Sequence, residues 1–170
     1  SYSYGILWIG ENHLAKNKED YCDSLQEVEA YMRFIGGGYQ SEENMKQFIR
    51  KSPEALQFFE SCGIPFRLIE GLTDHYYPHA PGSKSTGRSI ETELISGREL
   101  GEWKEQVLLP PHTPYCITVE ELVNWGGVTN VGQWDQELID KRMRQEMRGL
   151  GVGLISHFVK ALVQRNVPLL

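Results

Sequence analysis

The residues best suited to chemistry lie in one short segment, residues 72–82, which reads LTDHYYPHAPG. Two tyrosines, Tyr76 and Tyr77, stand there between an acid, two histidines and a proline-glycine pair. Proline and glycine punctuate ordered loops rather than core strands. A tyrosine phenol in such a loop can donate or accept a proton. We therefore predict a surface or cleft loop that is a candidate for proton transfer. The alternative is a structural loop whose aromatic rings cover the core.

An arginine follows this segment in the sequence Gly87-Arg88-Ser89-Ile90. A phenol exchanges its proton near neutral pH when its surroundings lower its usual pKa of about 10, and a nearby positive charge does so. Arg88 is a candidate for that charge, or for binding an anionic or carbonyl group of a substrate. The alternative interpretation is that Arg88 ties down the loop.

Other chemically capable residues form weaker patterns. His75 with His79, and His112 with Cys116, have ligand types and spacings that zinc accepts, but no predicted helix aligns either pair, so we interpret them as scattered loop residues. Cys62 and Cys116 have apolar neighbours and are interpreted as small buried hydrophobic residues rather than nucleophiles. We expect no metal site.

A glycine-rich stretch at residues 149–153 precedes a predicted helix, where backbone amides can bind an anion. No strand is predicted to lead into it, and the G-x-G-x-x-G fingerprint is not met. We interpret these glycines as packing positions.

Helices dominate the elements that position these residues. Ser24 with Glu27 fits a capping box, and glycines 36–38 end that helix. A second helix is predicted from Ser41, and Ser52 followed by Pro53 predicts the start of another. Further helices are expected over residues 118–126, 134–147 and 150–165, strands over 64–69, 88–94 and from 167, and a loop over 101–114. The predicted fold class is α+β, helix-dominated with a few short strands.

Bulk properties exclude several classes of protein. The 170 residues carry a net charge of −6, and the basic residues are interleaved with acids, which argues against a nucleic-acid partner. No apolar stretch approaches the roughly 20 residues that span a bilayer. The three cysteines are an odd number without a C-x-x-C pair, so we expect a reduced, cytoplasmic protein.

Five segments, in this order, resemble the FAD-dependent 3-ketosteroid dehydrogenases and their fumarate reductase-like relatives. The first, SYGILWIGENH, is similar to the family's S-G-G-x-x-W-x-P-x-N, and HYYPHAPG followed by GRSI is similar to its D-Y-Y-P-x-x-P-G and G-R-S-I. Tyr2 and Tyr4 stand where the family has glycines. The five segments are residues 3–13, 21–31, 58–66, 75–90 and 151–170.

This resemblance implies a flavoprotein that transfers a hydride between a carbon of a small-molecule substrate, a 3-ketosteroid or another enone or dicarboxylate, and FAD. It implies that Tyr76 is a catalytic residue that assists removal of the substrate proton. Tyr77 and Arg88 are expected to support the substrate. The segment with Ser3, Gly5 and Asn12 is expected to lie along the flavin.

The resemblance covers only part of such an enzyme. It implies that residues 1–170 are a single fragment of the FAD-binding and substrate region, without the nucleotide-binding N-terminus and the later cap domain. The fold would then be carved from an α/β FAD-binding flavoprotein, and the isolated fragment is expected to be inactive. Because its sheet would be incomplete, we expect it to associate with itself.

Two alternative functions remain open at this point. Trp103, Trp125 and Trp134, which we expect to be exposed, suit a non-catalytic helical interaction module, because tryptophan is enriched at binding hot spots. A weaker alternative is a small zinc protein that uses the histidines and Cys116 named above.

Overall fold

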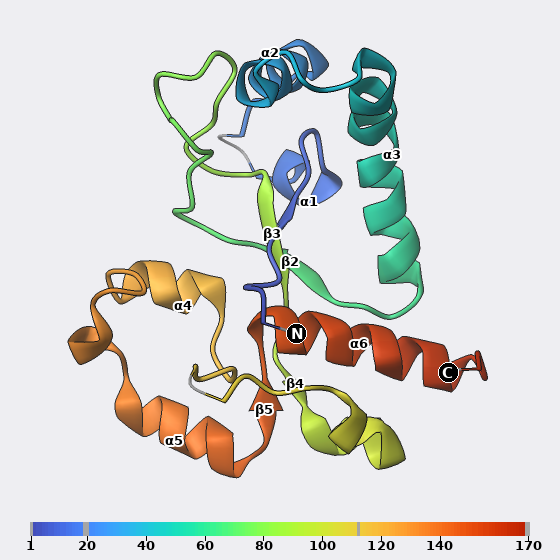
Figure 1. Ribbon diagram of the computed structural model, residues 1–170, viewed down its shortest axis with the longest axis vertical. Helices are drawn as coiled ribbons and strands as arrows, with labels where there is room; N and C mark the ends of the chain where they lie inside the picture. Colours follow the sequence, from blue (N-terminus) through green and yellow to red (C-terminus); the bar gives the residue numbers. More distant parts are fainter. Residues whose placement is uncertain (1, 19–20, 112, 169–170) are drawn as a thin grey trace. The chain divides into compact units, whose positions relative to one another are not determined.

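A computed structural model describes residues 2–18, 21–111 and 113–168 of the chain (Figure 1). The chain divides into two compact units. The tyrosine-loop unit comprises Leu7–Ser61 and Leu68–Ile90. The C-terminal unit comprises Ser1–Ile6, Cys62–Arg67 and Glu91–Leu170.

The tyrosine-loop unit combines three helices with parts of a three-stranded sheet. β1 (Leu7–Trp8) pairs antiparallel with β3 (Ser89–Thr92), so that Leu7 faces Ile90 and Trp8 faces Ser89. β2 (Phe66–Leu68) lies on the other side of β3, in the sheet order β1-β3-β2. The helices are α1 (His13–Lys16), α2 (Leu25–Gly36) and α3 (Glu42–Ser61). The long segment between β2 and β3 carries the tyrosine pair.

The predicted limits of α2 are confirmed. The Ser24 hydroxyl accepts a hydrogen bond from the Glu27 amide at the helix start, and Gly37 closes the helix in the left-handed conformation at φ +56°. Val28 and Tyr31 are the buried positions of α2, three residues apart, so one face of the helix packs inward.

The helix start predicted at Ser52 is wrong, because α3 runs without a break from Glu42 to Ser61 with Pro53 inside it. Proline removes one helical hydrogen bond and normally costs about 3 kcal/mol inside a helix. Met45, Ile49 and Leu56 nevertheless form a buried stripe with members on both sides of Pro53, and each such side chain gains about 1.5–3 kcal/mol on burial. Burial of that stripe therefore outweighs the local signal.

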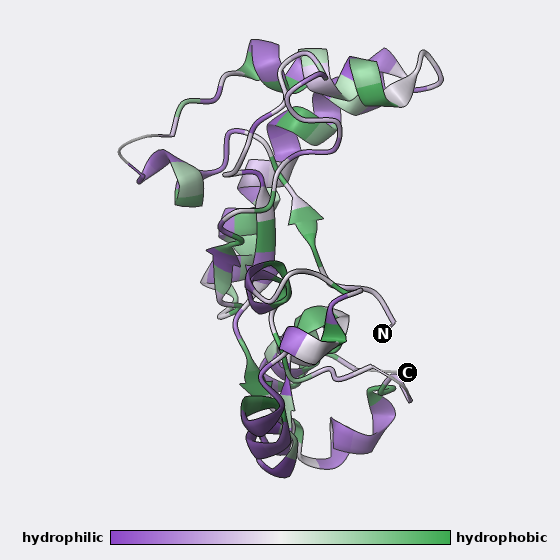
Figure 2. Cartoon of the chain, turned by 90° about the vertical axis from the view of Figure 1, so that its left-hand side faces the viewer, coloured by the Kyte–Doolittle hydropathy of each residue, from purple (hydrophilic) through white to green (hydrophobic). Residues whose placement is uncertain are grey.

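The C-terminal unit carries the remaining elements. β4 (Ile95–Ser96) pairs antiparallel with β5 (Met147–Arg148). A core cluster of Leu100, Val107 and Val152 holds η1 against α6. The helical elements are η1 (Gly97–Gln106), α4 (Val119–Asn124), η2 (Val131–Gln133), α5 (Gln136–Arg144) and α6 (Leu150–Gln164). Figure 2 shows both hydrophilic and hydrophobic residues along the helices, as amphipathic elements require.

Several predictions for this unit are confirmed and three are wrong. The capping box at Thr118 starts α4, and α5 and α6 lie where helices were expected. Residues 101–106, predicted as loop, belong to η1, which Ser96 caps. β5 leads directly into the glycine-rich stretch, where no strand was expected. Residues 167–168 are not in a strand, and 169–170 lie outside the described residues.

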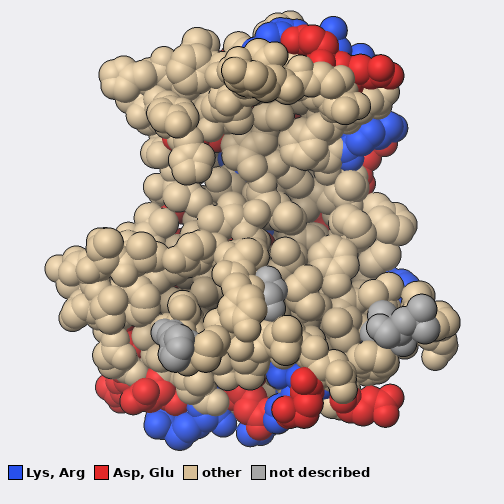
Figure 3. Space-filling view, in the orientation of Figure 1, with Lys and Arg blue, Asp and Glu red and all other residues tan. Residues whose placement is uncertain are grey.

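The predicted fold class is confirmed: helices dominate and the strands are few and short. Among the described residues, no helix is both long and apolar enough to cross a membrane. Where charged side chains gather on the face in Figure 3, basic and acidic ones lie next to each other. Ion pairs of Arg33 with Glu42 and of Lys51 with Glu54 likewise join opposite charges.

Candidate functional site

The segment that carries the tyrosine pair is a compact series of turns. The Asp74 amide donates to the carbonyl of Lys84 at 2.9 Å, which closes the loop at its base. At its tip the Tyr76 carbonyl accepts from the amides of His79 and Ala80, at 2.7 and 3.0 Å. Ala80 is buried, whereas the neighbouring side chains are exposed. The loop is therefore ordered by its own backbone, as the prolines and glycines predicted.

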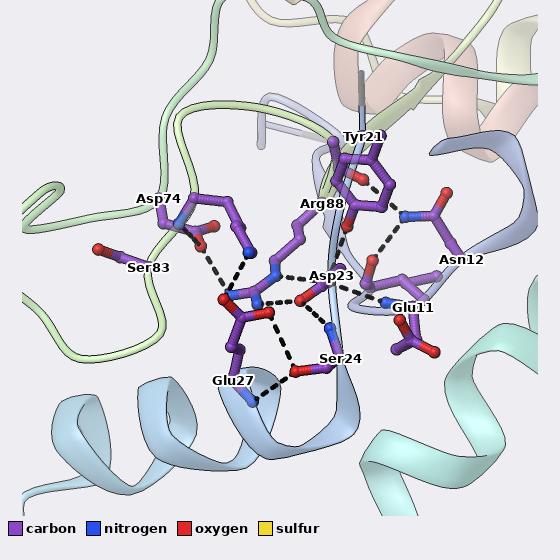
Figure 4. Close-up of polar contacts among 12 residues, drawn as sticks. Glu11, Asn12, Tyr21, Asp23, Ser24, Glu27, Asp74, Ser83 and Arg88 are labelled. Atoms are coloured by element: carbon purple, nitrogen blue, oxygen red, sulfur yellow. Dashed lines mark hydrogen bonds and ion pairs between the residues drawn. The ribbon is translucent and has the colours of Figure 1, made fainter. Parts of the chain in front are cut away.

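A buried ionic cluster anchors the base of the loop (Figure 4). The Arg88 guanidinium donates to both oxygens of Asp23, at 2.9 Å from Nε and 2.5 Å from Nη2, and to Asp74 Oδ2 at 2.9 Å. The side chains of Arg88 and Asp23 are fully buried and that of Asp74 is 2% exposed. The cluster thus joins the entry to α2, the tyrosine loop and the start of β3.

Hydrogen bonding keeps these charges ionised inside the protein. Burial alone raises the pKa of the Asp23 carboxyl, but the hydrogen bonds from Arg88 and Tyr21 and the positive charge of Arg88 bring the pKa below its usual value. Burial alone lowers the pKa of Arg88, and its contacts with Asp23 and Asp74 raise the pKa above the usual value. The pKa of the Tyr21 phenol is raised, first by burial and then by its hydrogen bond to Asp23.

Aromatic side chains enclose the cluster. The Trp8 indole nitrogen donates to Asp74 Oδ1 at 2.7 Å, and the Trp8 ring stacks on Tyr31 at 5.3 Å between centroids. The Arg88 guanidinium carbon lies 5.4 Å from the Trp8 centroid and 5.7 Å from that of Tyr31. These cation–π contacts add attraction to the ion pairs in a water-poor site. The interpretation that Arg88 ties down the loop is therefore supported by its contacts.

The tyrosines themselves face outward. Tyr76 is 69% exposed and Tyr77 is 44% exposed. The Tyr76 ring meets Phe34 of α2 edge-on at 6.2 Å between centroids. Tyr76 has φ +63°, a left-handed backbone conformation that is a genuine outlier for a bulky residue. Such strain persists only where the surroundings hold it, and it is often found at functional sites.

The remaining predicted site residues fall into both units. Asn12, in the tyrosine-loop unit, is fully buried: its amide nitrogen donates to the carbonyls of Ile9 and Gly87, each at 2.7 Å, and its oxygen caps α1. Asn12 therefore holds the backbone of Gly87, the residue before Arg88. Ser3 and Gly5 belong to the C-terminal unit. Their predicted contact with a flavin, like that of Asn12, stays a prediction.

Ser3 and Gly5 pack closely against the glycine-rich start of α6. The Ser3 carbonyl accepts from the Gly151 amide at 2.9 Å. A Cβ on Gly5 would lie 2.7 Å from the Leu150 carbonyl group, so only glycine fits there. A Cβ on Gly149 would lie 2.1 Å from the Ile117 carbonyl oxygen. The interpretation of glycines 149–153 as packing positions agrees with these contacts.

The tryptophans of the proposed helical interaction module are less exposed than that alternative function requires. The three tryptophans expected to be exposed are only partly exposed. Trp125 and Trp134 contact each other at 6.4 Å between centroids, and Trp103 packs on the Leu100 cluster. The expectation that they form an exposed binding surface is therefore wrong.

The described residues of the zinc alternative belong to different units. His75 and His79 are exposed in the tyrosine-loop unit, whereas Cys116 is buried in the C-terminal unit, and His112 lies outside the described residues. Among the described residues, no group of three or more His, Cys, Asp or Glu is arranged to hold a metal ion. Burial, the largest cause, raises the pKa of the Cys116 thiol.

Sequence reasoning missed the two carboxylates of the cluster. Asp23 lies in the second of the segments that carry the resemblance, but no ionic partner was predicted for it, and Asp74 was noticed only as an acid near the tyrosines. Arg88 and Asp23 are 65 residues apart, so no local pattern connects them. The usable signal was that an arginine entering a buried strand requires an acidic partner, because a buried charge is costly unless it is paired.

No protein-family model matches the chain. Over 100 residues, 58% of the chain, it is 31% identical to the 3-oxosteroid 1-dehydrogenase of Mycolicibacterium smegmatis, of which the match covers 17%. Over 116 residues, 68% of the chain, it is 28% identical to the 4-oxocyclohex-2-ene-1-carboxylate 5-dehydrogenase of Sinomonas cyclohexanicum, of which 19% is covered.

A solved structure has the same fold as nearly the whole chain. It is the 3-ketosteroid delta1-dehydrogenase of Sterolibacterium denitrificans in complex with 1,4-androstadiene-3,17-dione, with a TM-score of 0.75 at 22% identity. The alignment covers 98% of this chain and 32% of that structure. The chain thus spans about a third of the solved relative and matches less than a fifth of the curated ones. The predicted resemblance to 3-ketosteroid dehydrogenases is confirmed.

Proposed function

We propose that the protein to which this chain belongs is an oxidoreductase that removes two hydrogens from a ring ketone, and that Tyr76 takes part in the proton transfer. One observation carries the proposal: the strained, outward-facing Tyr76 stands two residues after Asp74, which a fully buried arginine holds in place. The relatives named above act on, or are crystallised with, ring ketones, which supports this substrate class.

The chemistry follows from the ketone. A carbon next to a carbonyl loses a proton comparatively easily, because the carbonyl oxygen takes up the negative charge. Removing that proton, and a hydride from the neighbouring carbon, leaves a carbon–carbon double bond. The Tyr76 phenol assists the proton removal, and Tyr77 and the loop held by Arg88 orient the substrate. FAD, when bound, is the acceptor of the hydride.

The residues beside Ser3 fit one part of a flavin. A pocket of about 250 Å³ lies there, walled by tyrosine rings that offer flat apolar surfaces. Pockets that enclose a drug-sized ligand measure about 300–1,000 Å³, so this one is too small for a whole dinucleotide. We propose that Ser3 contributes to flavin binding and that Gly5 shapes the backbone beside it. Asn12, in the tyrosine-loop unit, is proposed as a further flavin contact through the backbone that it supports. The described lining residues are Tyr2, Ser3, Tyr4, Pro110, Thr113, Tyr115, Leu150 and Val152.

The test uses the protein produced from its complete gene. Tyr76→Phe keeps the ring and removes the hydroxyl, so it should lower kcat about 10²- to 10⁴-fold, the usual contribution of a positioned proton-transfer group. Tyr39→Phe removes a hydroxyl from a tyrosine of the same unit that is 98% exposed and lies outside the loop. It is the matched control and should retain kcat within about fivefold. Steady-state rates with a 3-ketosteroid and with 4-oxocyclohex-2-ene-1-carboxylate measure both.

Two results would overturn the proposal. One is a purified protein without bound flavin that also fails to bind added FAD, as judged by visible absorption. The other is a Tyr76→Phe enzyme that turns over both ketones at the unaltered rate. An unchanged flavin spectrum in Tyr76→Phe is the check that the loss of rate reflects the phenol and not loss of the cofactor.

A further inference from the structure

A pocket of about 530 Å³ in the tyrosine-loop unit is unused by the proposed function. Ala15, Leu68 and Tyr21 are among the residues that line it, and we call these three its apolar floor. Neither Tyr76 nor Tyr77 is among the lining residues that the structure describes. The volume lies within the range of about 300–1,000 Å³ that suits small organic ligands. A ring compound would place its faces against this floor.

The charged part of the lining selects against charged ligands. Lys18 Nζ and Glu70 Oε1 lie 2.5 Å apart, and both side chains are more than half exposed. Two opposite charges at this distance largely cancel, so an anion attracted by Lys18 is repelled by Glu70, and the converse holds for a cation. A neutral molecule gains from both, because the ammonium donates a hydrogen bond and the carboxylate accepts one.

Further polar groups favour an oxygen-bearing ligand. The exposed residues Ser85 and Thr86 also line the pocket, and each hydroxyl both donates and accepts. The Tyr21 hydroxyl is already committed, because it donates to Asp23 at 2.7 Å (Figure 4). Tyr21 therefore offers its ring alone. A Cβ on Gly87 would lie 2.1 Å from that ring, so the Tyr21 ring packs tightly against the Gly87 backbone.

We propose that this pocket binds a neutral alicyclic or aromatic ring compound that carries both a hydroxyl and a carbonyl group. The carbonyl accepts from Lys18, the hydroxyl donates to Glu70, and the ring lies on the apolar floor. Binding requires neither flavin nor Tyr76, so this inference stands or falls separately from the proposed dehydrogenase activity.

The test is an NMR titration of the 170-residue chain with 4-hydroxycyclohexanone, followed through the backbone amides of Gly71 and Thr86. Saturable shifts at these amides are expected. Thr86→Trp fills the pocket from an exposed position and should weaken binding at least tenfold. Thr73→Trp places the same ring on an exposed loop residue that does not line the pocket, and should leave the affinity within twofold.

Charge selectivity and a second variant complete the test. The ring carboxylate 4-oxocyclohexane-1-carboxylate and the ammonium form of 4-aminocyclohexanol should each bind at least fivefold more weakly than 4-hydroxycyclohexanone. Lys18→Met should weaken binding of the neutral probe about threefold or more, with Lys16→Met as its neighbouring control. Tyr76→Phe should not change the affinity. The absence of saturable shifts, equal binding of the charged probes, or shifts that survive both pocket variants would overturn the proposal.

Discussion

The chain holds its two candidate binding regions in place by opposite means. The tyrosine loop depends on buried charge, with Arg88 between two carboxylates and aromatic rings around them. The segment with Ser3 and Gly5 depends on the absence of side-chain atoms, because its backbone contacts the start of α6 directly. The first arrangement fixes an exposed phenol without covering it. The second fixes a backbone segment by close steric fit and by the hydrogen bond from the Gly151 amide to the Ser3 carbonyl.

This difference predicts which kind of substitution destabilises each region. A buried ion pair that loses one partner leaves an uncompensated charge, which is among the costliest of single changes. A close backbone contact that gains a methyl group must separate or strain, and its cost depends on how far the neighbour can move.

The largest effect is expected from Arg88→Met. It leaves Asp23 and Asp74 buried without their cation, so the free energy of unfolding should fall by about 3–5 kcal/mol. Arg33→Met is the control, because Arg33 also contacts two carboxylates but its side chain is 44% exposed, so its loss should cost far less than that of Arg88. Urea denaturation measures both. Equal losses for the two variants would show that burial of the cluster does not matter.

Gly5→Ala tests the second region. The added Cβ would meet the Leu150 carbonyl group at 2.7 Å while the residue is held at φ +69°, so we expect a loss of about 3 kcal/mol from strain and overlap together. Gly127→Ala is the matched control in the same unit. It has φ +87° with no atom within 4 Å of its Cβ, so about 1 kcal/mol of backbone strain should remain. Hydrogen exchange of the α6 amides reports the loss locally, and similar values for both variants would contradict the steric argument.

The comparison also shows what a sequence can and cannot provide. The limits of α2 and α4 were predictable because Ser24 and Thr118 act on residues three positions away. The loop that carries Tyr76 was recognisable from its prolines and glycines. The continuity of α3 through Pro53 was not, because burial along the whole helix decides it.

The partners of the site residues were harder still to predict. The pairing of Arg88 with Asp23 was beyond reach, because 65 residues separate them and any acid could have met that arginine. Similarly, a glycine such as Gly5 has the same appearance in a sequence whether it approaches a cofactor or a helix.

A smaller effect is expected at Tyr76 itself. Tyr76→Ala and Tyr76→Gly remove the same ring contact with Phe34, but only glycine relieves the left-handed backbone at φ +63°. The glycine variant should therefore be more stable than the alanine variant by about 1 kcal/mol. At Tyr77, which is not among the residues with positive φ, the order should reverse, because glycine gains freedom in the unfolded chain. Thermal unfolding of the four variants measures this. The same order at both positions would mean that the loop does not hold Tyr76 under strain.

The smallest expected effect is that the two units lose stability at different pH values. Burial, the largest cause, lowers the pKa of His157 in α6, whose Nε2 bonds to the Glu93 carbonyl at 2.9 Å as a neutral ring. A group with a lowered pKa in the folded state stabilises the protein above its unfolded pKa, about 6.5 for histidine, and that stability is lost as the pH falls through the folded value.

The same rule applies to Asp23, whose lowered pKa stabilises the protein above the usual carboxyl value of 3.8. Acidification from pH 7.5 should therefore lower the hydrogen-exchange protection factors of the α6 amides, which are corrected for the intrinsic effect of pH on exchange, before it lowers those of α2. His157→Gln, which keeps a donor for Glu93 but cannot be protonated, should abolish the early change in α6 and leave the late one in α2; simultaneous loss in both helices would show that one acid transition governs the two units.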